Sequence, residues 1–125
     1  MRESKVVDPI TNAFPDGIFP ARCPSRVLLE HVTSKWGVLV LVSLADGPKR
    51  WSELRRRAQG VSEKMLAQTL KTLERDGLVD RDAQPVIPPR VDYSLTQRGT
   101  ELVEVLVPLF TWVVQHADEV VGEHA

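Results

Sequence analysis

Residues 52–78 read "SELRRRAQGVSEKMLAQTLKTLERDGL", and the order of apolar and polar residues in this stretch predicts a pair of helices. In its second half, Leu66, Leu70 and Leu73 recur at i, i+4 and i+7, so they lie on one face of a helix. The opposite face carries three long cations and one amide, which are Lys64, Gln68, Lys71 and Arg75.

A shorter helix precedes this one and is joined to it by a turn. The segment "ELRRRA" (53–58) is a typical helical sequence, and we expect Ser52 to cap its start. Gln59-Gly60-Val61 forms a three-residue turn, after which Ser62 caps the second helix and Asp76-Gly77 ends it. Two helices joined in this way form a helix-turn-helix, here at about residues 52–76.

The residues after the second helix change to the alternating pattern of strands. "LVDR" (78–81) and "VDYSL" (91–95) alternate apolar and polar residues, whereas "DAQPVIPP" between them holds three prolines and cannot be a helix. We therefore expect a hairpin over about residues 78–95, in the position of a wing. Thr96 is expected to cap a final helix over about residues 97–121.

Two further helices are expected before the helix-turn-helix. Pro24 suits the first turn of a helix that ends near Val32, and residues 34–45 are apolar on most sides, which indicates a central helix. Residues 1–22 contain three prolines and no periodicity, so we expect an extended arm. The expected fold is mainly α with a small β-hairpin, a winged helix-turn-helix domain over residues 23–121.

The positive charge of the chain is concentrated in one segment. The 125 residues have a net charge of −1, yet residues 49–75 hold eight Lys and Arg against three Glu, a local charge of +5. This asymmetry indicates a local contact with a polyanion. The longest apolar run, Trp36 to Ala45, is too short to span a membrane, and the N-terminus lacks a signal-peptide pattern, so we expect a cytoplasmic protein with no membrane contact.

Double-stranded DNA is the partner that this arrangement favours. An α-helix fits the major groove, where its exposed side chains reach base edges and phosphates. Lys64 and Gln68 lie in the early turns and are placed for bases, whereas Lys71 and Arg75 lie further along and are expected to meet phosphates. The other DNA-binding candidates lie at the two helix starts, on the short helix and on the wing: Arg50, Ser52, Arg55, Ser62 and Arg90.

The final helix is apolar over more than half of its circumference, although one small domain needs an apolar stripe of only about 100°. The excess favours a second copy of the chain as a partner, and the alternative is a helix covered by the N-terminal arm of the same chain. A two-fold homodimer would present two recognition helices to a pseudo-palindromic operator. The candidate dimerisation residues on this helix are Leu106, Phe110, Val113 and Val114.

Three stretches resemble the HxlR-type branch of winged helix-turn-helix regulators, which are relatives of the MarR group. They are "CPSRVLLEHVTSKWGVLVL" (23–41), "GPKRWSELRRRAQGVSEKMLAQTLKTLERDGLVDR" (47–81) and "VIPPRVDYSLTQRG" (86–99). The resemblance implies a dimeric bacterial transcription factor, either a repressor or an activator, whose first and last helices form the dimer. It adds Val27 and Leu28 to the candidate dimerisation residues.

The sequence also departs from the family pattern. Trp51 stands where phenylalanine is usual, Ala67 replaces a threonine or serine of the recognition helix, and Gln84 replaces an aromatic residue of the wing. The segment before residue 23 is longer than usual. These departures leave the operator sequence open, and nothing in the chain identifies an effector.

The one cysteine matches a position with a known role in the family. Several members carry a cysteine just before the first helix that senses oxidants or electrophiles, and Cys23 stands at that position. Arg22, Arg26 and a helix N-terminus would favour its thiolate. Cys23 is therefore a candidate thiol sensor, and the alternative is a small buried apolar residue.

Two other classes of function stand beside DNA binding. A winged helix can instead be a protein–protein interaction module without DNA binding, but such a module usually lacks cations on the groove-facing row. An enzyme is not expected, because no nucleophile–base pair or glycine-rich phosphate loop is present. We expect no cofactor and no metal site, because a polar fraying helix end is the simpler interpretation of His116, Glu119, Glu123 and His124.

Overall fold

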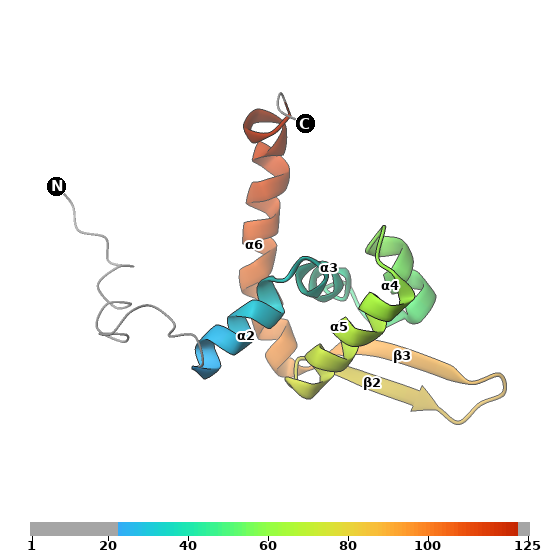
Figure 1. Ribbon diagram of the computed structural model, residues 1–125. Helices are drawn as coiled ribbons and strands as arrows, with labels where there is room; N and C mark the ends of the chain where they lie inside the picture. The colour runs from blue at the N-terminus through green and yellow to red at the C-terminus, as the bar shows by residue number, and fades with distance from the viewer. Residues whose placement is uncertain (1–22, 123–125) are drawn as a thin grey trace.

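The computed structural model describes residues 23–122, so the expected arm over residues 1–22 lies outside the described residues, as do Glu123 and His124. The described part is mostly helical with a small antiparallel sheet, which confirms the predicted fold class (Figure 1). Within it, no helix is long and apolar enough to cross a membrane. In chain order, the elements are α2 (Pro24–Thr33), α3 (Lys35–Ser43), β1 (Lys49–Arg50), α4 (Trp51–Arg57), α5 (Glu63–Arg75), β2 (Val79–Gln84), β3 (Arg90–Leu95) and α6 (Gln97–Val120).

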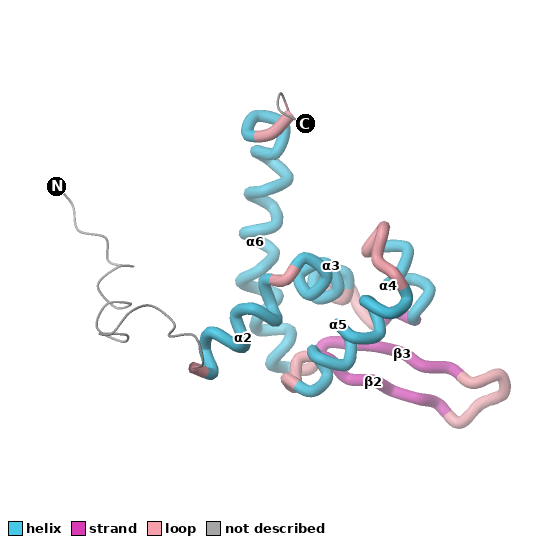
Figure 2. Tube along the Cα trace, viewed as in Figure 1, coloured by secondary structure: helices cyan, strands magenta, loops and turns pink. Residues whose placement is uncertain are grey.

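Helix α3 is the centre of the packing, as its apolar sequence predicts. It contacts α2, α4, α5 and α6, and its Val40 and Leu41 are fully buried. Leu54 of α4 and Leu66 of α5 are fully buried in the same cluster. Two parts of the molecule extend away from this body: the second half of α6, and the β2–β3 hairpin, which projects beside α5 (Figures 1 and 2).

The sheet has one strand more than the sequence predicted. Its order is β1-β3-β2, and the short strand β1 pairs with β3 through Lys49 opposite Tyr93. Two residues are too few to show an alternating pattern, so this strand was not expected. The hairpin loop is also shorter than predicted, because Gln84 still pairs with Arg90 and β2 ends at Gln84, directly before Pro85.

Two of the three expected helix caps are confirmed. The Ser62 hydroxyl accepts the Met65 N–H at 3.0 Å, and the Thr96 hydroxyl accepts the Gly99 N–H at 3.0 Å. The expectation for Ser52 was wrong, because α4 begins at Trp51 and Ser52 lies inside its first turn. The chain passes directly from β1 into the helix, and the Glu53 carboxylate accepts the backbone N–H of Arg50 at 3.1 Å instead.

The start of α6 is held against the residues that end α5. The Thr96 N–H donates to the Leu78 carbonyl at 3.0 Å, and the Thr96 hydroxyl donates to the Gly77 carbonyl at 2.7 Å. Gly99 lies so close to this chain segment that a Cβ there would overlap the Leu78 carbonyl oxygen. Backbone contact therefore fixes the direction of α6 relative to the end of α5.

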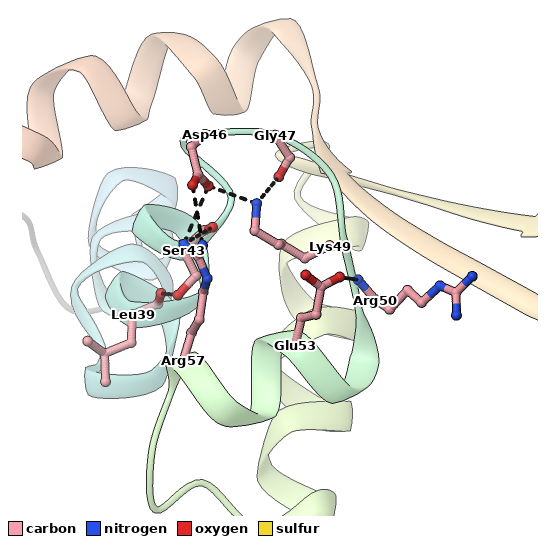
Figure 3. Close-up of polar contacts among 8 residues, drawn as sticks. All are labelled: Leu39, Ser43, Asp46, Gly47, Lys49, Arg50, Glu53 and Arg57. Carbon is pink, nitrogen blue, oxygen red and sulfur yellow. Dashed lines mark hydrogen bonds and ion pairs between the residues drawn. The ribbon is translucent and has the colours of Figure 1, made fainter.

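A cluster of charges joins the end of α3 to β1 and α4 (Figure 3). The side chain of Lys49 is only 8% exposed, and its ammonium donates to Asp46 Oδ1 at 2.8 Å and to the Gly47 carbonyl at 2.9 Å. The Arg57 guanidinium donates to Asp46 Oδ2 at 3.3 Å. The Lys49 hydrogen bond and the charges of Arg57 and Lys49 hold the pKa of Asp46 below its ordinary value of 3.8.

Because of this cluster, the stability of the folded state depends on pH in the acidic range. Because the pKa of Asp46 is lower in the folded state, its charge contributes stability above pH 3.8, and this stability is lost as the pH falls through the lowered pKa. We expect Asp46→Asn to have a lower Tm than the wild type at about pH 6, and the difference to shrink below about pH 3. Thermal unfolding followed by circular dichroism across this range checks it; a difference that does not change with pH would contradict the expectation.

Candidate nucleic-acid interface

The row of long polar side chains on α5 is exposed, as its sequence predicts. The leucines at 66, 70 and 73 are buried, which turns the opposite face of the helix to solvent. Within residues 23–122, no hydrogen bond or ion pair engages the side chains of this row. The row, here called the basic row, is Lys64, Gln68, Lys71 and Arg75, and its groups are free to bind an external anion.

The hairpin carries a further cation next to its loop. The Arg90 guanidinium lies 3.3 Å from Asp92 Oδ1, and the Gln84 amide donates to Asp92 Oδ2 at 2.8 Å. Asp92 thus holds Arg90 at the base of the hairpin loop and leaves nearly half of its side chain exposed. At the tip, Ile87 is 99% exposed. A fully exposed apolar side chain on a projecting loop is suited to a groove wall rather than to a phosphate.

Arg81 is a basic residue of this surface that the sequence analysis missed. It lies on β2, and together with Lys71, Glu74 and Arg75 of α5 it lines a shallow depression between the helix and the hairpin. Three cations and one acid make this depression positive, which suits a phosphate. The two-residue period of a strand could have identified Arg81 from the sequence. Arg81 is two residues after the buried Val79, so both side chains lie on the face of β2 that is turned towards the body.

The arginines of α4 differ in their availability. Arg57 is bonded to Asp46 and so has a structural role. The Arg55 guanidinium lies 3.4 Å from Glu63 Oε1, which joins the two helices of the helix-turn-helix. Arg56 and Ser52 are exposed, and the Arg50 side chain points away from the Asp46 cluster in Figure 3. These three remain available at the rim of the surface.

The candidate dimerisation residues are divided between the surface and the core. Val27 and Leu28 of α2 are exposed, as are Val113 and Val114 of α6, while Phe110 is half-buried. Leu106 is the correction, because it is only 7% exposed and belongs to the core of its own chain. It faces α3 in the half of the helix that packs against the body, so it is not available to a partner.

Cys23 is half-exposed and is the N-cap of α2. Its sulfur accepts the backbone N–H of Arg26 at 3.4 Å, an ordinary distance for a sulfur acceptor. In the single chain this side chain is intermediate in exposure, neither fully buried nor fully open. The thiol is partly open to reagents and lies at the start of a helix whose remaining surface is largely exposed.

Comparisons with known proteins agree on one class. Residues 31–121 match the family described as HxlR-like helix-turn-helix. An uncharacterized HTH-type transcriptional regulator of Escherichia coli (strain K12), YtfH, is 52% identical over 105 residues, which are 84% of this chain and 83% of that protein.

Solved structures give the same result. The ytfH structure from Salmonella typhimurium has a TM-score of 0.79 and 48% identity, covering 86% of this chain and 96% of that one. The redox regulator HypR in its oxidized form has a TM-score of 0.69 and 33% identity, covering 74% of this chain and 96% of that one.

The position of Arg81 leads to a prediction about salt dependence. Arg81→Gln should weaken binding to any DNA duplex and reduce the slope of log K against log salt concentration by about one, because one phosphate contact is lost. Fluorescence anisotropy across a salt series measures both quantities. The matched control is Arg26→Gln, since Arg26 is ion-paired with Glu30 on α2 at 3.1 Å; an equal change in both variants, or none in Arg81→Gln, would contradict the assignment.

Proposed function

The chain belongs to the HxlR-like helix-turn-helix family and is a DNA-binding transcriptional regulator, and from this premise we propose that it acts as a homodimer on a pseudo-palindromic operator. The observation that carries the proposal is the basic row, which has no partner within residues 23–122 and is held outward by three buried leucines. The family consists of transcriptional regulators rather than enzymes, and the chain is proposed to work in the cytoplasm, where bacterial DNA lies.

Each part of the surface has a proposed task. Helix α5 enters the major groove, where Lys64 and Gln68 read base edges, while Lys71 and Arg75 meet phosphates. Ser62 presents the free N–H groups at the start of α5 to a phosphate. The hairpin lies along the neighbouring backbone or minor groove, which Arg90 contacts. The rim residues Arg50, Ser52 and Arg56 bind the flanking phosphates.

The homodimer is supported by apolar surface that the described residues, 23–122, leave exposed. Val114 is 67% exposed and Trp112 is 54% exposed on the part of α6 that extends from the body, and Leu28 of α2 is 45% exposed. Side chains of this size on a projecting helix are costly to leave in water, so association of two copies would remove them from solvent. Two copies would supply two recognition helices, one for each half-site.

DNA binding and its stoichiometry can be measured together. We expect the protein to prefer the duplex upstream of its own reading frame over a scrambled copy at about 150 mM salt, with two chains per duplex by sedimentation. The double variant Lys64→Glu/Lys71→Glu should lose this binding while its circular dichroism and Tm stay near those of the wild type, since both side chains are exposed. If the double variant binds the duplex as tightly as the wild type does, the proposal that α5 contacts DNA through Lys64 and Lys71 is contradicted.

A second candidate function is a response to oxidants through Cys23. It is supported by the half-exposed thiol and by the likeness to the redox regulator HypR. The chain has one cysteine, so a disulfide must join two chains or one chain and a small thiol. Diamide accepts the two electrons and two protons that two thiols release when they form this bond.

The redox proposal has a direct test. Diamide should release the wild type from DNA, dithiothreitol should restore binding, and Cys23→Ser should stay bound throughout. Anisotropy with the labelled operator duplex measures release, and mass spectrometry identifies the disulfide. Release of Cys23→Ser at the same diamide concentration would remove Cys23 from the mechanism.

A further inference from the structure

One polar contact joins α2 to the end of the recognition helix. His31 Nδ1 of α2 lies 2.7 Å from Oδ2 of Asp76, the C-cap residue of α5, and the two side chains are 34% and 17% exposed. Both side chains are partly buried, so the contact lies between the two helices and not on their outer faces. The residues are 45 positions apart, so this contact is a tertiary link and not part of local helix structure.

Asp76 is a costly residue for the position that it occupies. The C-terminal end of a helix carries partial negative charge, so a carboxylate there opposes the helix dipole. The ending of the helix does not need this side chain, because the Asp76 backbone N–H already donates to the Thr72 carbonyl at 2.9 Å and Gly77 takes the left-handed conformation with φ +75°. The carboxylate is therefore explained by its bond to His31.

The bond also has few neighbours that could replace it. Helix α2 is exposed along most of its length, and Val32 is its buried residue. On the other side, the end of α5 is tied to the start of α6 through the Gly77 and Leu78 carbonyls. The last turn of α5, which carries Arg75 and directly follows Lys71, is thus held between α6 and the His31–Asp76 bond.

We propose that His31 and Asp76 are positioning residues for DNA recognition, and that their bond fixes the last turn of α5 against α2. The inference rests on the proposed role of α5 in the major groove. It adds that the partner-facing helix α2 and the recognition helix move as one unit. A displacement at the start of α2, where Cys23 lies, then reaches the phosphate-binding end of α5 through this bond.

Four variants test the proposal. His31→Phe keeps the ring and loses the bond, and Asp76→Ala loses the bond while removing an acid that opposes the helix dipole. Val32→Ala is the control, because it weakens the packing of α2 in the core and leaves the bond in place. The exchange variant His31→Asp/Asp76→His offers the same pair of groups in the opposite order.

The readouts are operator affinity by anisotropy, folded fraction by circular dichroism at the same temperature, and amide exchange in the last turn of α5. We expect His31→Phe and Asp76→Ala to bind the operator at least about fivefold more weakly while fully folded, and to exchange these amides faster. Val32→Ala should bind as the wild type does under conditions where it is folded, and the exchange variant should regain most of the affinity.

The outcomes separate this inference from the proposed function. Wild-type affinity in both single variants, or an equal loss in Val32→Ala, would overturn the positioning role while DNA recognition by α5 stands. Failure of the wild-type protein to prefer its operator would overturn the proposed function. In that case unchanged amide exchange in His31→Phe would also remove the mechanical link between α2 and α5.

Discussion

Burial of three leucines on one face of α5 is the constraint on which the rest of the molecule depends. The side chains at 66, 70 and 73 pack into the cluster built by α3 and α4, and a helix with one buried face has its opposite face determined as well. The cations therefore point outward because the leucines point inward. The proposed recognition of DNA by this surface is therefore a consequence of core packing, and the core would have to rearrange before the helix could turn.

The charges of the helix-turn-helix serve two different purposes. Some hold the fold together: Lys49 and Arg57 converge on Asp46, and Arg55 pairs with Glu63. Others lack a partner among residues 23–122 and remain available to DNA. A count of positive residues in the sequence cannot separate these groups, because the separation depends on which acids lie nearby in space. The same segment thus contains charged residues that stabilise the fold and charged residues that are available to bind DNA.

The sequence was sufficient where the determining contacts are local. The helix pair, the hairpin and the caps at Ser62 and Thr96 follow from neighbouring residues, and the exposure of the basic row follows from helical period. It was insufficient where distant residues decide. Pairing of β1 with β3 moved the start of α4 away from Ser52, and packing against α3 placed Leu106 in the core.

The same physical reason explains the site residues that were missed. Arg81 joins the basic surface because a strand and a helix from different parts of the chain lie together. The His31–Asp76 bond joins residues 45 positions apart, so no local sequence pattern predicts it. Periodicity predicts which way a side chain points, but it does not predict which side chain of another element will meet it.

Close contact between Gly99 and the Leu78 carbonyl has a consequence for genome recognition. Backbone contacts fix the start of α6 against the end of α5. In a dimer assembled through α6, they would therefore help to set the distance between the two recognition helices. Each added base pair moves a half-site by about 3.4 Å and rotates it by about 34° around the duplex. A dimer whose recognition helices are each fixed to the start of α6 would follow such a change poorly, so the spacing of the half-sites would contribute to operator specificity as well as their bases.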